Sequence, residues 1–248
     1  MEIIKKTALI TGASSGIGFG IASELSKAGC KVIINSKSNR KLVAAAKKIP
    51  GSIPISADIT CPDQSKELIR QVKSYTKSID ILVCNVGNGT SSVPGKEKYK
   101  DWQKMFDINF FSTTNIIENS RNIVTKKIGS IICISSICGI DYIPGAPITY
   151  SVAKAALNHY IKLSAREFAK NGIRINGIAP GNILFKNSVW DKKIQNNKRE
   201  TIKMLNDNVA LKRFGSISEI ASLVLFLSSQ ESEFITGSII PVDGGQLR

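Results

Sequence analysis

A tyrosine and a lysine four residues apart, Tyr150 and Lys154, form a pair of side chains suited to proton transfer. Residues 150–154 open a predicted helix, and this spacing places the phenol and the ammonium about 40° apart on one helical face. A free tyrosine has a pKa near ~10, and a nearby ammonium favours the phenolate. The pair therefore indicates general acid and base catalysis without a metal.

Two further polar residues are expected at the same place. Ser136 follows the apolar run 130–135, which predicts a strand, and Asn109 lies on the helix that precedes that strand. Because the carboxyl ends of parallel strands meet at one edge of a sheet, we expect Ser136 beside Tyr150 and Lys154. Ser135 stands directly before Ser136 and competes for the same role.

A glycine-rich segment, TGASSGIG at 11–18, lies between the first predicted strand and the first predicted helix. Such a turn points backbone N–H groups and the positive end of the helix dipole at a phosphate. A purely structural turn is the alternative, but the strand before it and the helix after it favour dinucleotide binding. The residues expected to contact that ligand are Gly12, Ser14, Ser15, Gly16, Ile17 and Gly18.

The segment after the second predicted strand, INSKSNR at 34–40, bears on the choice of cofactor. NAD enzymes place an acidic residue there to bind the ribose 2′-hydroxyl, whereas NADP enzymes place basic residues. Here Ser36 occupies the acidic position and Lys37 follows it, with no carboxylate anywhere in 31–56. We therefore predict NADP(H), with a basic solvated loop as the alternative.

Charge and rare residue types exclude several classes of protein. Lys and Arg number 34 against 19 Asp and Glu, a formal net charge of +15 that raises the question of an anionic partner. The single histidine, His159, lies about 140° from Lys154 around an ideal helix and is interpreted as structural. Neither a Ser-His-Asp hydrolase nor a metal site is therefore expected.

The sequence also bears on localisation. A membrane span needs roughly 20 apolar residues, and the best candidate, 220–227, is far shorter. The five cysteines lack a Cys-x-x-Cys pair and mostly lie in apolar surroundings. We expect a soluble protein with reduced thiols in the cytoplasm and no contact with a membrane.

Short apolar runs alternate with helix-period stretches from end to end, which predicts a parallel sheet with crossover helices. We predict an α/β fold: one Rossmann-like, doubly wound domain over 1–248, with a seven-stranded parallel sheet between two layers of helices. The expected strands are 7–10, 31–35, 53–57, 79–84, 130–135, 173–178 and 238–242.

Two irregular stretches, 88–100 and 182–213, each follow the carboxyl end of a predicted strand, where open α/β sheets bind ligands. The second stretch has room for helix of its own. We interpret it as a mobile basic lid over the substrate, with a solvated charged surface as the alternative. Its basic residues are Lys186, Lys192, Lys193, Lys198, Arg199 and Lys203.

With these motifs in this order, the chain resembles the short-chain dehydrogenase/reductase family over 6–245. The glycine-rich turn matches 11–18, the acidic adenine contact 58–59, the Asn-Ala-Gly motif 85–87, the Pro-Gly turn 180–181, and the carboxyl-terminal signature 235–237 with 242–245. The resemblance implies catalytic roles for Asn109, Ser136, Tyr150 and Lys154. The further cofactor contacts that it implies are Asp58, Ile59, Asn85, Gly87, Tyr150, Lys154, Pro180, Gly181 and Ile183.

The resemblance also implies a mechanism. Tyr150 would donate a proton to a carbonyl oxygen that Ser136 hydrogen-bonds, while a reduced nicotinamide delivers hydride to the carbon. Lys154 would tune the phenol and hold the nicotinamide ribose, and Asn109 would hold a water that connects Lys154 to solvent. Ser136 is preferred to Ser135 because the family's Ser-x-x-Gly pattern continues at 136–139.

The chain departs from the family pattern at three places. Val86 replaces the usual alanine, and the interval from Ser136 to Tyr150 is about one residue longer than in many members. Asn182 follows the Pro-Gly turn where many relatives have an apolar residue. A threonine that often holds the nicotinamide carboxamide is missing there, and Ser188 is the nearest hydroxyl downstream.

By this resemblance we expect an NADP(H)-dependent oxidoreductase that interconverts a carbonyl and a secondary alcohol, closest in pattern to 3-oxoacyl-[acyl-carrier-protein] reductases. The alternative within the family is a dehydrogenase of a sugar, polyol or other small alcohol. A remote alternative is a non-catalytic protein that binds nucleic acid, but the lysines form no basic stripe interleaved with aromatic residues, so no nucleic acid is expected.

The resemblance also bears on the partners of the protein. Acyl carrier proteins are acidic, so Lys126, Lys127 and the basic residues of 186–203 are able to steer one toward the enzyme. The family commonly forms homotetramers through the long helices around 101–126 and 150–170 and through the carboxyl-terminal strand, and we expect the same here.

Overall fold

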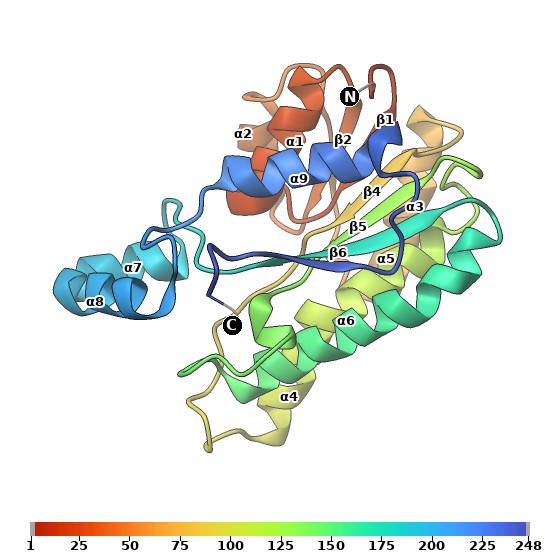
Figure 1. The fold of residues 1–248 in the computed structure, drawn as a ribbon. Coiled ribbons are helices and arrows are strands. Elements are labelled where there is room, and N and C mark those ends of the chain that lie inside the picture. The colour runs from red at the N-terminus through yellow and green to blue at the C-terminus, as the bar shows by residue number, and fades with distance from the viewer. Residues whose placement is uncertain (1–2, 247–248) are drawn as a thin grey trace.

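A computed structural model describes residues 3–246 of the chain, and apolar runs form its strands. Within these residues the sheet has seven parallel strands in the order β3-β2-β1-β4-β5-β6-β7 (Figure 1). This order confirms the predicted doubly wound topology, in which the chain reverses direction across the sheet between β1 and β4. The strands are β1 (Thr7–Ile10), β2 (Lys31–Ser36), β3 (Ile53–Ser56), β4 (Ile81–Cys84), β5 (Ser130–Ile134), β6 (Arg174–Pro180) and β7 (Ile239–Val242).

The observed strands lie where the apolar runs predicted them, with ends displaced by one or two residues. The largest shifts are at β4 and β6. Ile79 forms only an isolated parallel bridge with Val124, so β4 begins two residues later than expected. Strand β6 continues to Pro180, because β7 pairs with it as far as Val242.

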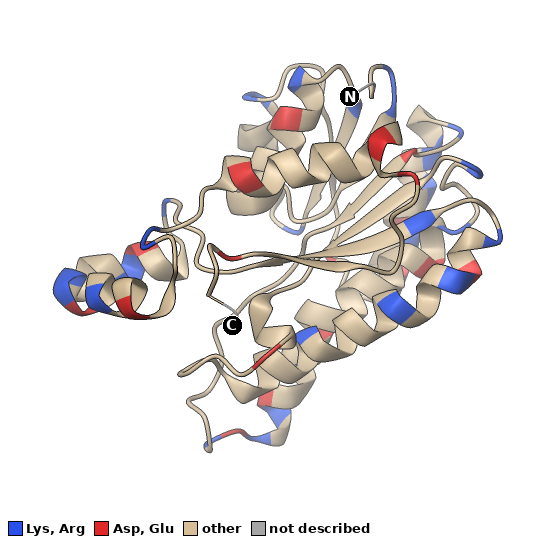
Figure 2. Cartoon of the chain, viewed as in Figure 1, with Lys and Arg blue, Asp and Glu red and all other residues tan. Residues whose placement is uncertain are grey.

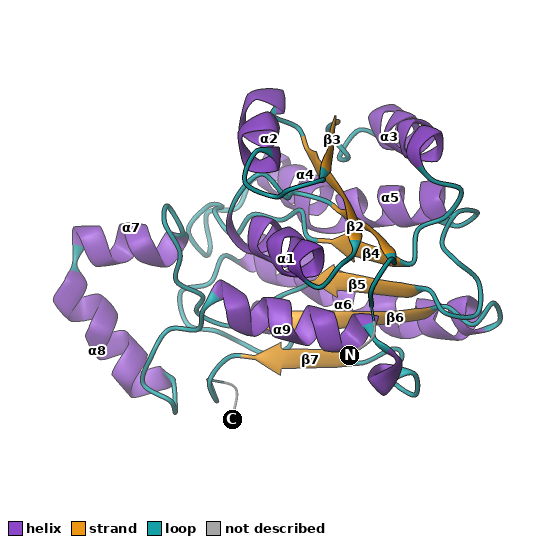
Figure 3. Ribbon diagram, turned by 90° about the horizontal axis from the view of Figure 1, so that it is seen from above, coloured by secondary structure: helices purple, strands orange, loops and turns teal. Residues whose placement is uncertain are grey.

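Helices cover both faces of the sheet, as Figure 3 shows. One core packs β-strand side chains against α1, α2 and α9, with Ile21, Leu42 and Val224 fully buried. The opposite core involves α3, α5 and α6. The helices are α1 (Gly16–Lys27), α2 (Asn39–Ala46), α3 (Pro62–Tyr75), α4 (Tyr99–Phe106), α5 (Ser112–Ser120), α6 (Ile148–Ala169), α7 (Val189–Asn196), α8 (Lys198–Asn208) and α9 (Ile217–Ser228), with short π or 3-10 turns at η1 (Asp107–Phe111), η2 (Ile137–Gly139) and η3 (Gln230–Ser232).

The stretch 182–213 contains two helices, α7 and α8, which project from the body of the molecule (Figure 1). Side-chain caps begin both: the Ser188 hydroxyl accepts from the Asp191 N–H at 3.0 Å, and Asn197 Oδ1 accepts from the Glu200 N–H at 3.2 Å. In α7 no residue is buried, and in α8 only Thr201 and Leu205 are. Among residues 3–246, no helix is both long enough and apolar enough to cross a membrane.

Candidate active site

A cavity of about 640 Å³ lies at the carboxyl ends of the central strands. Its wall combines the glycine-rich turn after β1, the end of β2, and the loops that follow β4, β5 and β6. It reaches from Lys37 and Asp58 at one end to Tyr150 and Lys154 at the other. One continuous space therefore joins the predicted adenosine contacts to the predicted catalytic residues, at the sheet edge where this fold class binds ligands.

Asn85 holds the glycine-rich turn against the strand next to it. Its Nδ2 donates to the Thr11 and Gly12 carbonyl oxygens at 3.1 and 3.3 Å, and its backbone N–H donates to the Thr11 hydroxyl at 3.0 Å. Gly12 and Gly16 have φ of +64° and +60°, which other residues rarely adopt. A Cβ on Gly18 would lie 2.4 Å from Asn85 Nδ2, so this glycine lets helix and turn pack closely. The turn is thus fixed where α1 begins, with the N–H groups of the first helical turn available to an anion.

The end of the cavity at Lys37 and Asp58 combines serine hydroxyls with one ion pair. Lys37 is exposed, and its Nζ lies 4.0 Å from the Asp58 carboxylate, which also accepts from Thr60. The Ser36 hydroxyl donates to the Ser14 hydroxyl at 3.0 Å. Ser36 and Lys37 therefore lie beside the glycine-rich turn, as a contact with an adenosine 2′-phosphate requires.

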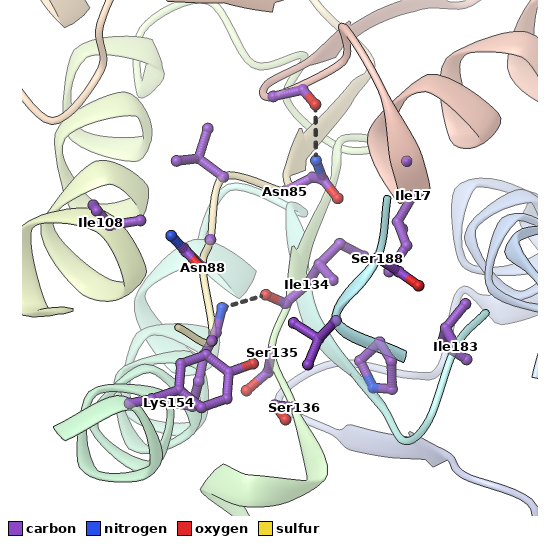
Figure 4. A pocket seen from close by; sticks show the side chains of 18 of the residues that line it. Ile17, Asn85, Asn88, Ile108, Ile134, Ser135, Ser136, Lys154, Ile183 and Ser188 are labelled. Atoms are coloured by element: carbon purple, nitrogen blue, oxygen red, sulfur yellow. Dashed lines mark hydrogen bonds between the residues drawn. The ribbon is translucent and has the colours of Figure 1, made fainter. Parts of the chain in front are cut away.

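Tyr150 and Lys154 lie one turn apart on α6, and both line the cavity. Lys154 is 2% exposed, and its Nζ donates to the Ile134 carbonyl oxygen at 2.8 Å (Figure 4). Burial lowers the pKa of Lys154 to about 8. Burial also raises the pKa of Tyr150 to about 12, and a hydrogen bond with the Ser136 side chain opposes this rise.

The sequence-based expectation is that Lys154 and the positive charge of an oxidised nicotinamide together favour the phenolate. In the structure, Lys154 is not among the causes that shift the pKa of Tyr150. Removal of the phenol from water is the largest cause of the shift and opposes ionisation. A tyrosine with this pKa is protonated at neutral pH. It is therefore able to act as a general acid, the form that a carbonyl reduction needs.

The two candidate serines have different surroundings. The Ser136 hydroxyl accepts from the Cys138 N–H at 3.2 Å and lies close enough to Tyr150 to affect the pKa of its phenol. The Ser135 hydroxyl instead donates to Asn158 Oδ1 at 2.5 Å. Ser136 is thus beside the phenol, whereas the Ser135 hydroxyl is bound to α6.

Asn109 lies behind the cavity wall, in the π-helical turn η1 between α4 and α5. It is fully buried: its Oδ1 accepts from the Asn88 N–H at 2.9 Å, and its Nδ2 donates to the Asn88 and Met105 carbonyl oxygens. A Cβ on Gly87 would lie 3.1 Å from Asn109 Oδ1 and 3.2 Å from Lys154 Nζ. The asparagine and the lysine thus flank the same backbone segment, the 85–87 motif.

The structure brings most of the predicted contacts to the cavity. The exceptions are Ser14, Gly18 and Asn109, which are not among the residues that line it. His159 is exposed on α6, away from the buried Lys154. The predicted residues that line the cavity are Gly12, Ser15, Gly16, Ile17, Ser36, Lys37, Asp58, Ile59, Asn85, Gly87, Ser136, Tyr150, Lys154, Pro180, Gly181 and Ile183.

The wall near Tyr150 contains residues that the motifs did not indicate. It is largely apolar and comes from η2, from the loop between η2 and α6, and from the start of α7; its members include Ile137, Ile143, Pro144, Pro147, Val189 and Trp190. The Lys193 ammonium lies 4.5 Å from the centre of the Trp190 ring, at the cavity rim. The wall also contains Ser188, whose hydroxyl caps α7, and Phe185, whose ring lies 2.9 Å from where a Cβ of Gly16 would be.

The described residues fit a dinucleotide phosphate. Three lysines line the cavity (Lys37, Lys154 and Lys193), and Asp58 is the one acidic residue among the described lining residues. This charge balance favours an anion, and Gly12 and Gly16 carry no side chain of their own between a diphosphate and the backbone N–H groups at the start of α1. Within residues 3–246 no group of three or more His, Cys, Asp or Glu side chains is placed to hold a metal ion.

The sequence of the chain is similar to those of known reductases. Residues 12–246 match the sequence model of a protein family described as Enoyl-(Acyl carrier protein) reductase. The 3-oxoacyl-[acyl-carrier-protein] reductase FabG of Rickettsia prowazekii is 36% identical, over 100% of this chain and 99% of that protein. FabG of Thermotoga maritima is 33% identical, over 99% of both.

Solved structures similar to this chain include proteins in complex with NADP or NADPH. L-sorbose reductase from Gluconobacter frateurii, complexed with NADPH and L-sorbose, superposes with a TM-score of 0.93 at 29% identity, covering 100% of this chain and 98% of that one. The Pseudomonas aeruginosa RhlG/NADP active-site complex gives a TM-score of 0.90 at 26% identity, covering 98% and 97%. Together with the Tyr150 and Lys154 geometry, these matches show that the chain belongs to the short-chain dehydrogenase/reductase family, whose enzymes interconvert carbonyl and alcohol groups.

Proposed function

We propose that this enzyme is an NADPH-dependent 3-oxoacyl reductase whose substrate is a thioester of an acyl carrier protein. The observation that carries the proposal is the apolar wall beside Tyr150, which offers a lipophilic chain a surface next to the reacting groups. The two FabG relatives, similar over the whole chain, support the same substrate class.

The residues that would hold NADPH run along the cavity. The start of α1 and the glycine-rich turn would take the diphosphate, Lys37 the 2′-phosphate, and Asp58 and Ile59 the adenine. Lys154 would hold the nicotinamide ribose, and the 180–183 segment the nicotinamide. When bound, the reduced nicotinamide supplies the hydride that reduces the carbonyl carbon.

The side chains of this enzyme would handle the proton and the developing charge. Tyr150, protonated at neutral pH, donates its phenolic proton to the substrate oxygen as the carbon is reduced. The Ser136 hydroxyl donates a hydrogen bond to the same oxygen. Lys154 would stabilise the phenolate that remains, and Asn109 would hold a water that connects Lys154 to solvent and so returns a proton.

The basic lid would guide the carrier protein. Figure 2 shows Lys and Arg positions along the ribbons of α7 and α8, interspersed with fewer Asp and Glu positions. Among these basic residues, Lys193 lines the cavity. Charges at the rim of an interface chiefly raise association rates. An acidic carrier protein would therefore be steered toward the cavity.

A reductase of a ketose or other polyol precursor is the second candidate. Its support is the 0.93 TM-score with the L-sorbose reductase, together with the polar Asn182 in the cavity wall. Substrate preference decides between the two. The test is a comparison of kcat/KM for acetoacetyl-N-acetylcysteamine, acetoacetyl-acyl carrier protein and L-sorbose, monitored by absorbance of NADPH. A ketose preferred over both thioesters would reject the acyl assignment.

A homotetramer completes the proposal. Several large apolar side chains are exposed on the helices that the family uses for assembly, among them Phe111, Val152 and Leu163, and Phe234 is fully exposed just before β7. Contiguous exposed apolar surface favours association. Light scattering during gel filtration measures the mass directly, and a monomer would contradict the proposal.

A further inference from the structure

The turn that carries Ser136 is fixed to α6 by one buried side chain, Asn158. This asparagine lies one helical turn after Lys154 and two after Tyr150, and it is 6% exposed. Its Oδ1 accepts from the Ser135 hydroxyl at 2.5 Å, and its Nδ2 donates to the Gly139 carbonyl oxygen at 2.9 Å. A single carboxamide thus binds the chain on both sides of Ser136.

The segment between these two anchor points has little freedom of its own. The Cys138 N–H donates to the Ser136 hydroxyl at 3.2 Å, and the Gly139 N–H donates to the Ser136 carbonyl oxygen at 3.0 Å. On the β5 side, the Ser135 N–H donates to the Ile178 carbonyl oxygen at 2.7 Å. The turn therefore moves as a unit, and the two bonds to Asn158 set where that unit lies.

The same turn lies directly on the helix that carries the catalytic pair. A Cβ on Gly139 would be 2.6 Å from the Lys154 carbonyl carbon and 2.8 Å from the Ala155 nitrogen. Close backbone contact of this kind transmits any displacement of the turn into the separation of Ser136 and Tyr150. Asn158 does not line the cavity, so its effect on chemistry is through position.

We propose that Asn158 is a positioning residue that holds the Ser136 hydroxyl at the reacting oxygen, beside the Tyr150 phenol. The role needs one acceptor and one donor in a fixed plane, which asparagine provides. Aspartate accepts from Ser135 but has no donor for the Gly139 carbonyl, and leucine provides neither. This inference rests on the reaction class of the family and is independent of the acyl substrate.

The test compares Asn158→Leu and Asn158→Asp with a matched control, Asn176→Leu. Asn176 is also a buried carboxamide; it donates to the Ile235 carbonyl oxygen at 2.8 Å and accepts from the Ser238 N–H at 3.1 Å, and these side-chain bonds do not involve the Ser136 turn. A misplaced catalytic group costs up to ~10²-fold in rate. We expect kcat of both Asn158 variants to fall about 10-fold to 100-fold, with KM and the NADPH dissociation constant within about twofold of wild type.

A second readout separates position from stability. With NADPD in place of NADPH, the isotope effect on kcat should rise in the Asn158 variants, because the chemical step becomes slower, and should be unchanged in Asn176→Leu. Ser135→Ala removes one of the two bonds and should reproduce part of the loss. Combined with Asn158→Leu it should add almost nothing. If Asn158→Leu does not fold, Asn158→Asp and Ser135→Ala carry the test.

A third readout needs no substrate, so failure of the acyl proposal leaves it intact. Cys138 lies in the turn and is partly exposed, and Cys61 is a partly exposed reference on another element. Peptide mass spectrometry after iodoacetamide treatment should show Cys138 labelled several-fold faster relative to Cys61 in Asn158→Leu, but not in Asn176→Leu. Wild-type kcat with unchanged Cys138 labelling in the Asn158 variants would overturn the positioning role, as would losses of kcat in Asn176→Leu of the same size.

Discussion

Lys154 donates a hydrogen bond from its buried ammonium to the Ile134 carbonyl oxygen at 2.8 Å. This bond joins α6, which carries the proton donor, to the last residue of β5, from which the Ser136 turn departs. The lysine is therefore part of the framework of the site, in addition to its proposed contact with the cofactor. Burial disfavours the charged form of this ammonium and lowers the pKa of Lys154 to about 8.

The first prediction concerns stability against pH. The pKa of Lys154 is about 8 in the folded chain and 10.5 ordinarily, so between these values the folded chain has released a proton that the unfolded chain still binds. Stability from this group therefore rises with pH over that window. Relative to Lys154→Met, wild type should gain roughly 2 to 3 kcal/mol of unfolding free energy between pH 7 and pH 10.5. Urea denaturation of both proteins measures it, and parallel pH profiles would contradict the shift.

The second prediction concerns the proton donor. Tyr150→Phe keeps the ring that fills the site but removes the acid, and positioned acid catalysis is worth roughly 10²-fold to 10⁴-fold. We expect kcat to fall by that factor while the NADPH dissociation constant, measured by fluorescence, stays within about twofold. Tyr142→Phe, at an exposed tyrosine that does not line the cavity, is the control. Near wild-type turnover in Tyr150→Phe would remove the tyrosine from the mechanism.

The third prediction separates the two serines. The Ser136 hydroxyl lies at the phenol and the Ser135 hydroxyl at Asn158, so Ser136→Ala should lower kcat more than Ser135→Ala. Loss of one hydrogen bond to a developing oxyanion costs about 10²-fold to 10³-fold, whereas a positioning bond costs less. Steady-state kinetics of the two variants decide the order. A greater loss in Ser135→Ala would reverse the assignment.

Much of this site follows from local sequence. Aliphatic runs predicted the seven strands, the strand order of the fold class brought their carboxyl ends together, and a spacing of four placed Tyr150 and Lys154 on one face. The strands and the Tyr150 and Lys154 pair depend on neighbouring residues, and the strand order follows from the fold class that the alternation of strands and helices indicates. The one-residue ambiguity between Ser135 and Ser136 was harder, because only the partner of each hydroxyl distinguishes them.

Other features depend on contacts between distant segments. The pKa of Tyr150 could not be read from its spacing to Lys154, since burial by the surrounding loops dominates it. The sequence indicated a role for Asn158 only weakly: it is a polar residue four positions after Lys154, on the buried face of α6. Phe185 packs against Gly16 from a distant part of the chain, and no pattern within either segment pairs them.

The fourth prediction concerns carrier-protein docking. Lys198, Arg199 and Lys203 lie on α8, outside the described cavity lining. Their combined change to glutamate should lower kcat/KM for acetoacetyl-acyl carrier protein about 10-fold or more at low salt, chiefly through slower association. The same variant should reduce acetoacetyl-N-acetylcysteamine at the wild-type rate. A loss that persists at high ionic strength, or equal losses with both substrates, would argue against electrostatic docking.

The fifth prediction concerns the cofactor's 2′-phosphate. Lys37 is exposed and 4.0 Å from Asp58, so its ammonium is able to turn toward a phosphate with little rearrangement. Its loss in Lys37→Ala should weaken NADPH binding about 10-fold and leave NADH binding nearly unaffected, since a hydrogen bond to a charged group contributes roughly 1.5 kcal/mol or more.

The second substitution, Ser36→Asp, should act more strongly, because a carboxylate beside Ser14 repels the phosphate and offers the bare 2′-hydroxyl of NADH an acceptor. The ratio of kcat/KM for NADPH to that for NADH, in wild type and both variants, measures the effect, with Lys41→Ala on the exposed face of α2 as the control. A wild type that prefers NADH, or a ratio unchanged by both substitutions, would show that the phosphate is bound elsewhere.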